Sequence, residues 1–180
     1  MTEAQHRQPS ETQGGLKKMT AHSPKGCHQA LDDMLTAAEA LCVKRGRQLT
    51  TLRRRVLELI AEQNHPVGAY ELIDRLTGER GRTAPPTVYR ALEFLQTEGL
   101  VHRIESLNAF VACPHPDRPH ATQFLICKAC GATDELHDPG VAGTIAEHAA
   151  RSGFTIERQV VEVTGVCAVC QAPSEARSPA

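Results

Sequence analysis

The sequence predicts an α+β protein with a helical N-terminal unit that ends in a β-hairpin and a small C-terminal α/β unit. Three observations support this fold class. Segments before residue 100 repeat apolar residues at the helical period of about 3.6. Two short strand-like runs then flank a turn. Two C-x-x-C pairs bracket residues 127–170, and the chain between them alternates strand and helix patterns.

Length and composition exclude several classes of protein. The 180 residues, 41% of them hydrophobic, suffice for one ordinary domain or two small ones. No apolar run reaches the roughly 18 residues that span a membrane, and the first thirty residues lack the apolar core of a secretory signal. We therefore expect a cytoplasmic protein with reduced thiols, in which seven cysteines favour metal binding over disulfides.

The net charge of −1 conceals an uneven distribution. Residues 43–104 carry eleven Lys/Arg against seven Asp/Glu (+4), whereas residues 105–180 carry five against nine (−4). A basic module that contacts an anion would show this pattern, but charge alone favours an ordinary mixed surface.

The N-terminal unit follows a polar segment, residues 1–29, which we expect to be a flexible tail. The first helix should end at Gly46, and Thr50 or Thr51 can cap the second. "NHPVG" (64–68) should break the chain, and "TGERGRT" (77–83) should form a charged loop after the third helix. The expected core positions are Leu31, Met34, Leu35, Ala38, Leu41 and Cys42; then Leu52, Val56, Leu59 and Ile60; then Leu72, Ile73 and Leu76.

The segment "PPTVYRALEFLQTEG" (85–99) predicts a fourth helix, because proline fits a first turn and glycine fits a helix end. The run "LVHRIESLNAFVAC" then predicts a hairpin around residues 106–108. Helices followed by a hairpin is the order of a winged helix-turn-helix, although the helix pattern alone favours a plain bundle with a polar face. In the fourth helix Val88, Ala91, Leu92 and Leu95 should face inward, and Thr87, Tyr89, Arg90 and Glu93 outward, where hydroxyl and guanidinium groups suit DNA contacts.

A Pro-rich stretch, "CPHPDRPH" (113–120), cannot continue the interior of a sheet. We place a hinge at residues 109–119, between a winged-helix DNA-binding domain (30–108) and a second domain (120–172), with a tail at 173–180. In the second domain we expect strands at Gln123–Cys127 and near Thr133–His137, a helix at Val141–Arg151 that Gly153 stops, and a third strand that runs through residues 154–163.

The two C-x-x-C pairs are Cys127 with Cys130 and Cys167 with Cys170. Two residues between thiolates let both sulfurs reach one ion at about 2.3 Å. A closed site of four cysteines would be structural and would stabilise a small core of about 60 residues. A redox dithiol and scattered buried cysteines are the alternatives, and two pairs in one reduced domain favour zinc.

A second candidate zinc set combines one thiolate, two imidazoles and a carboxylate. Its members come from the hairpin, the hinge and the second domain, so a metal there would set the angle between the domains. His115 and His137 compete as ligands, and a histidine taken singly is more often a surface or hydrogen-bonded residue. The candidate set is His102, Cys113, His120 and Glu135.

An enzymatic role is not expected from these residues. A zinc deaminase needs His-x-Glu upstream of Pro-Cys-x-x-Cys and an open metal position for water. Here "ICKAC" has no preceding proline, Glu135 follows the pair, and both candidate sites are fully ligated by protein.

The sequence also resembles a known family. The runs "APPTVYRALEFLQTEGLVHRIESLNAFVAC", "HATQFLICKACG" and "GFTIERQVVEVTGVCAVC" are similar, in order and spacing, to the ferric uptake regulator family and its zinc uptake regulator branch. The resemblance covers about residues 31–172. It implies a dimeric bacterial repressor with an N-terminal winged helix and a C-terminal α/β dimerisation domain. It further implies a zinc-loaded homodimer that binds palindromic operators in double-stranded DNA and represses zinc-uptake genes, without a membrane or a small-molecule substrate.

Carried over position by position, the resemblance implies two Zn²⁺ per chain. The structural zinc falls on the four cysteines of the C-x-x-C pairs, and the sensing zinc on the mixed set described above. The implied DNA-reading residues are Tyr70 and Arg90, beside Thr87 and Tyr89 of the same outward face.

Departures from the family pattern bear on the metal. Iron and peroxide sensors carry "HHDH" before the first C-x-x-C, whereas this chain has "ATQF", and Gln159 stands where they carry a further histidine. An iron- or peroxide-sensing regulator is the alternative function, and the missing N/O ligands together with the Cys113 thiolate disfavour it. Cys27, Cys42 and the tail histidines receive no role.

Overall fold

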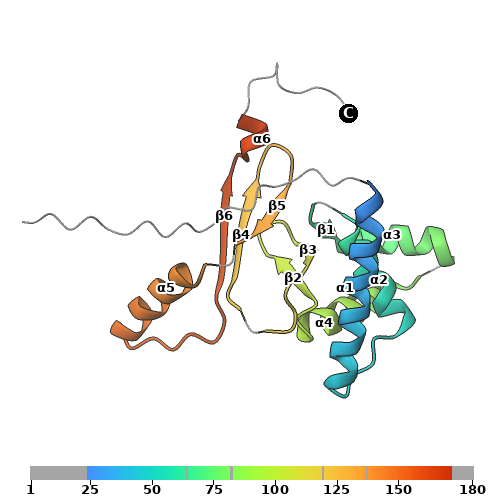
Figure 1. The fold of residues 1–180 in the computed structure, drawn as a ribbon, viewed down its shortest axis with the longest axis horizontal. Helices are drawn as coiled ribbons and strands as arrows, with labels where there is room; N and C mark the ends of the chain where they lie inside the picture. The colour runs from blue at the N-terminus through green and yellow to red at the C-terminus, as the bar shows by residue number, and fades with distance from the viewer. Residues whose placement is uncertain (1–23, 64, 82, 119, 137, 172–180) are drawn as a thin grey trace, which may run out of the picture.

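The first unit combines four helices with a three-stranded sheet. The computed structural model describes residues 24–171 except 64, 82, 119 and 137 (Figure 1). The tail histidines, His137 and the C-terminal tail lie outside the described residues, as do the side chains of residues 24–29, Cys27 among them. The elements of this unit are α1 (Pro24–Lys44), α2 (Thr51–Ala61), β1 (Val67–Gly68), α3 (Ala69–Arg80), α4 (Pro85–Thr97), β2 (Val101–Ile104) and β3 (Ala109–Ala112).

The helices of this unit share one hydrophobic core because each has an apolar face at the helical period. Helix α2 begins after Thr50, whose side chain accepts a hydrogen bond from the backbone N–H of Arg53 at 3.5 Å. The predicted inward face of α4 is confirmed, since Val88, Ala91, Leu92 and Leu95 are all buried.

The hairpin is part of a sheet with strand order β1-β3-β2, all antiparallel. The turn between β2 and β3 places Asn108 at a φ of 48°, a left-handed conformation that asparagine tolerates better than most residues. Helices followed by this sheet form a winged helix, and the plain bundle is thereby excluded. Strand β1 was not expected, because its two residues form a strand only by pairing with Phe110 and Ala109.

The second unit is a three-stranded sheet with strand order β5-β4-β6. Strands β4 and β5 are antiparallel, and β4 and β6 are parallel, with α5 in the connection between β5 and β6. Figure 1 shows α5 beyond β6, on the side away from the helices of the first unit. The bounds are β4 (Thr122–Cys127), β5 (Thr133–Glu135), α5 (Pro139–Arg151), β6 (Val160–Gly165) and α6 (Ala168–Gln171).

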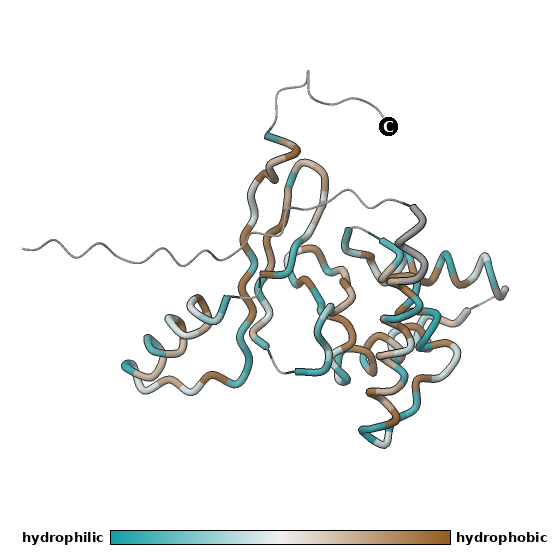
Figure 2. The backbone as a smooth tube through the Cα atoms, viewed as in Figure 1, coloured by the Kyte–Doolittle hydropathy of each residue, from teal (hydrophilic) through white to brown (hydrophobic). Residues whose placement is uncertain are grey.

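A second, small apolar cluster joins the two units. Ile104 of β2 is buried with Phe124 and Ile126 of β4, and Val111 of β3 packs against them. The β2–β3 hairpin therefore lies between the helices and the second sheet, as Figure 1 shows. Figure 2 also shows hydrophobic stretches along the second sheet and α5, away from the helical core.

Several expected boundaries were wrong. Helix α1 begins at Pro24, inside the expected tail. Helix α3 continues through the expected loop to Arg80 and ends at Gly81, whose φ is 79°. Arg55 of α2 holds that last turn by a 2.9 Å hydrogen bond to Glu79, a tertiary contact that the local pattern does not reveal.

The boundaries near the hinge and the last strand also differ from expectation. Strand β3, the second strand of the predicted hairpin, lies beyond residue 108, where we placed the start of the hinge, because its backbone pairs with β1 and β2. Strand β6 begins at Val160 instead of residue 154, because its partner β4 begins at Thr122, directly opposite. Within the described residues, no helix is long and apolar enough to cross a membrane.

Candidate metal centres and nucleic-acid interface

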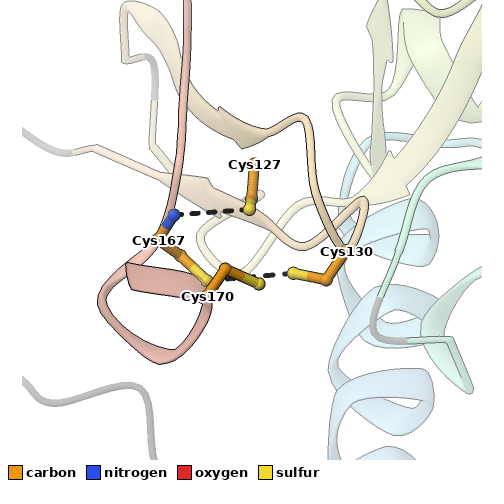
Figure 3. A group of neighbouring side chains, drawn as sticks. All are labelled: Cys127, Cys130, Cys167 and Cys170. Carbon is orange, nitrogen blue, oxygen red and sulfur yellow. Dashed lines mark hydrogen bonds between the residues drawn. The ribbon is translucent and has the colours of Figure 1, made fainter. Parts of the chain in front are cut away.

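Four cysteines meet at one end of the second sheet. Cys127 ends β4, Cys130 lies in the following turn, and Cys167 and Cys170 follow β6 (Figure 3). Their sulfur atoms all lie within 4.8 Å of one another. Cys130 Sγ and Cys167 Sγ are 3.8 Å apart, well beyond a disulfide bond of about 2.05 Å, and all four thiols are free.

The backbone around this cluster favours a thiolate at its centre. Hydrogen bonds from the backbone of Cys167, Cys130 and Ala129 lower the pKa of Cys127 to about 6. Hydrogen bonds with Cys130 and Cys167 raise the pKa of Cys170 to about 12. Four sulfurs around a partly anionic centre form the donor set that a soft divalent ion such as zinc prefers.

The mixed set also meets at one point. His102 lies on β2, Cys113 directly after β3, His120 before β4, and Glu135 at the end of β5. Their ligand atoms all lie within 4.8 Å of one another. The Nε2 atom of His120 is 2.8 Å from Glu135 Oε1, 3.1 Å from His102 Nε2 and 3.6 Å from Cys113 Sγ.

The hydrogen bonds around this set orient its ligand atoms. His120 Nδ1 lies 3.0 Å from the backbone oxygen of Arg118, and an oxygen can only accept, so Nδ1 carries the proton and donates. The lone pair of Nε2 then points into the cluster, as in metal-binding histidines. Glu135 Oε2 is buried and has no hydrogen-bond partner in the part of the chain that the structure describes, a cost that a bound cation would remove.

Burial makes this pocket bind protons tightly when no cation is present. It raises the pKa of Cys113 to about 12. It also raises the pKa of Glu135, although the adjacent His120 opposes the shift. The donor set fits zinc, which requires a deprotonated thiol and carboxylate.

Every candidate ligand except His137, which is not described, can be placed. The two sets that the sequence suggested are the two groups of potential metal ligands found among the described residues, and His115 belongs to neither. The competing assignment of His115 is therefore not supported by the geometry.

Sequence reasoning missed Arg45, which holds the loop that carries two of the ligands. Its guanidinium donates to the backbone oxygen of Glu98 at 2.6 Å and to that of Pro116 at 3.0 Å. Arg45 thereby connects the end of α4 to the segment between Cys113 and His120. No local signal distinguishes it from the neighbouring arginines.

The candidate nucleic-acid contacts are exposed. Tyr70, in the first turn of α3, is 76% exposed, and Tyr89 on α4 is 46% exposed. Thr87 and Arg90 are also exposed on the N-terminal half of α4, opposite its buried face. These side chains are available to a partner and have no place in the core.

Comparisons with known proteins agree with this architecture. The model of the ferric uptake regulator family matches residues 44–164. The zinc uptake regulation protein of Escherichia coli (strain K12) is 39% identical over 148 residues, which cover 82% of this chain and 86% of that protein. The ferric uptake regulation protein of the same strain is 29% identical over 126 residues, covering 69% of this chain and 84% of that protein.

Two solved structures are similar over both units. A zinc uptake regulator complexed with zinc and DNA is 40% identical, with a TM-score of 0.75, and the match covers 78% of this chain and 94% of that one. The holo form of XcZur is 46% identical, with a TM-score of 0.72, and the match covers 77% of this chain and 97% of that one.

Proposed function

The chain belongs to the ferric uptake regulator family, and from this premise we propose that it is a zinc-responsive, DNA-binding repressor of zinc-uptake genes. The observation that carries the proposal is the convergence of His102, Cys113, His120 and Glu135 from both units on one point. A metal-responsive regulator needs a site whose occupancy changes the orientation of one domain relative to the other. This cluster meets that need because its ligands come from both units.

Two zinc ions per chain follow from the two clusters. The four cysteines hold a structural ion within the second sheet. The mixed cluster holds the regulatory ion, which supplies a positive charge that the buried carboxylate and thiolate require. With this site filled, the hairpin, the hinge and the second sheet are joined, so the winged helix keeps one orientation.

DNA is the partner of the first unit. We assign its contacts to exposed side chains, Tyr70 on α3 and Thr87, Tyr89 and Arg90 on α4. In a winged helix the recognition helix enters the major groove, where hydroxyl and guanidinium groups suit base edges and phosphates. Zinc and DNA then strengthen each other's binding by the same factor, a coupling of about 1–3 kcal/mol. Because a repressor acts on the chromosome, its place in a bacterial cell is the cytoplasm.

The second unit carries the contact between two copies in a homodimer. Leu125 and Val163 are paired in register on adjacent strands, and both are exposed on the face opposite the buried Phe124. Phe154, just beyond α5, is 68% exposed. A twofold dimer through this face presents two recognition helices to a palindromic operator.

Other metals and an enzymatic function fit the chain less well. The described residues contain no third group of potential metal ligands, and the thiolate of Cys113 favours zinc over iron(II). Four protein ligands at each cluster leave no position for the water that a zinc hydrolase activates. The family consists of transcription regulators, and we assign the chain no catalytic role.

The test measures binding to DNA of zinc-import promoters while chelator buffers hold free zinc at picomolar levels. Wild-type protein should bind only as zinc rises and should not respond to iron(II). Cys113→Ser should lose the zinc response, and Arg90→Ala should lose affinity at every zinc level. Arg151→Ala, which alters an exposed arginine on α5, is the matched control and should behave as wild type. Binding that ignores zinc would overturn the proposal.

A further inference from the structure

One row of side chains across the second sheet contacts the hairpin at three points. Phe124 of β4 is the register partner of Glu135 on β5 and of Glu162 on β6. Partners in register on adjacent strands point to the same face of a sheet. Glu135, Phe124 and Glu162 therefore form a straight row on the face that meets the hairpin.

The hairpin meets this row in the same order. His102 of β2 lies 3.4 Å from Glu135, measured from Nε2 to Oε1. Ile104, two residues further on, is buried in the cluster with Phe124. The turn that follows reaches Glu162 at the other end of the row, 57 residues away in sequence.

Glu162 binds the backbone of that turn with both carboxylate oxygens. The N–H of Glu105 donates to Oε1 at 2.7 Å, and the N–H of Ser106 donates to Oε2 at 3.1 Å. Partial burial alone would raise the pKa of Glu162, but the hydrogen bonds from Ser106 and Glu105 outweigh it and hold the pKa below its usual value. Arg158 adds an ion pair with Glu105 at 3.3 Å.

We propose that Glu162 is a positioning residue whose carboxylate binds the β2–β3 turn, the tip of the wing, to the second sheet; we call this contact the latch. Together with the mixed metal cluster, the latch sets the orientation of the winged helix. The contacts of His102 and Ile104 hold one end and the middle of the row, and only Glu162 holds the turn at the other end, so its contact limits the motion of the turn. This inference rests on the proposed function, since orientation matters only if the winged helix must meet DNA.

The donors are the two backbone N–H groups of Glu105 and Ser106, to which the Ser106 side chain adds a hydrogen bond. Two variants weaken the contact, one by changing its acceptor and the other by changing a donor residue. Glu162→Gln keeps the shape but removes the charge and one acceptor oxygen. Ser106→Pro removes both donors of Ser106, its N–H and its hydroxyl, at the second position of the turn closed by Asn108 N–H and Glu105 O, where proline is favoured. Glu157→Gln, at an exposed carboxylate ahead of the same strand, is the matched control.

The experiment uses the full-length protein with its cysteine site filled by zinc. It measures the DNA affinity with the mixed site filled and with the mixed site empty, and takes the ratio of the two. Glu162→Gln and Ser106→Pro should each lower this ratio about fivefold, at the low end of known coupling, while the control keeps it. Amide exchange by NMR should show that the Glu105 N–H is protected in wild type and exchanges faster in Glu162→Gln. A purely stabilising role would instead lower the unfolding temperature and leave the ratio unchanged.

The outcomes separate this proposal from the proposed function. A wild-type ratio in Glu162→Gln, or an unprotected Glu105 amide in wild type, overturns the latch. If zinc does not change the DNA affinity of wild-type protein or of the Glu157→Gln control, the proposed repressor function is wrong. The amide exchange of Glu105 then tests the contact with Glu162 independently of DNA binding.

Discussion

The two candidate metal clusters differ most in where their ligands come from. All four cysteines belong to the second unit and lie at the ends of β4 and β6, strands that already pair in parallel. The mixed cluster takes His102 from the hairpin, Cys113 from its exit, and its other two ligands from the second unit. The first site joins the ends of two strands in one sheet, whereas the second joins one unit to the other.

Under the proposed assignment, one fold uses the same ion for stability at one cluster and for signalling at the other. An ion bound within one sheet stabilises that sheet and leaves the relation between units unchanged. An ion bound between units favours the orientation that brings its ligands together, and it can shift the population only by its preference for that orientation.

The largest effect is expected at the cysteine cluster. Cys130→Ser should unfold the second unit, lowering the free energy of unfolding by about 4 kcal/mol or more, because a structural metal supplies much of the stability of a small domain. Thermal and urea denaturation followed by circular dichroism measure the loss. Lys128→Ser, an exposed position inside the same C-x-x-C pair, should be almost neutral. Equal stability of the two variants would contradict a structural role for the cysteine cluster.

A loss of response without a loss of fold is expected at the mixed cluster. His120→Ala should reduce DNA affinity at saturating zinc by about tenfold to a hundredfold, because the link between the units is broken, while the cysteine cluster keeps its ion. Fluorescence anisotropy with operator DNA and elemental analysis measure the two effects. His115→Ala, in the same segment but outside the cluster, should bind like wild type. A loss of both zinc ions in His120→Ala would show that the clusters are not independent.

The smallest effect concerns protons released on zinc binding. In the zinc-free protein the pKa of Cys113 is about 12, so its thiol stays protonated between pH 7 and pH 8.5 and must lose a proton to bind zinc. The affinity of this site should therefore rise about tenfold per pH unit for that proton and fall on acidification. Cys127, with a pKa of about 6, is already a thiolate in this range and contributes no such proton.

Calorimetry in two buffers of different ionisation enthalpy counts the protons released. Titrating the mixed site with zinc while the cysteine site is already filled confines the count to protons released at the mixed site. An affinity that does not change over this pH range would contradict the assignment of the Cys113 thiol as a ligand.

Local patterns predicted the helices and the two groups of potential metal ligands well. The inward face of α4, the hairpin and the spacing within each C-x-x-C pair depend on neighbours within a few residues, so the sequence reveals them. The boundary of α3 was predicted wrongly, because a bond from Arg55 to Glu79 holds its last turn. Strand β1 was missed, because its two residues have no strand character without Phe110 opposite Val67.

What the sequence alone determined is the chemistry: which side chains can bind zinc, which helix faces are apolar, and where the chain turns. The tertiary structure decided which of these groups meet. The row of Glu135, Phe124 and Glu162 exists because β5 pairs with β4 in antiparallel register and β6 pairs with it in parallel register. Such registers depend on packing between segments far apart in the chain. For that reason the position of Glu162 opposite the hairpin turn becomes visible only in the folded protein.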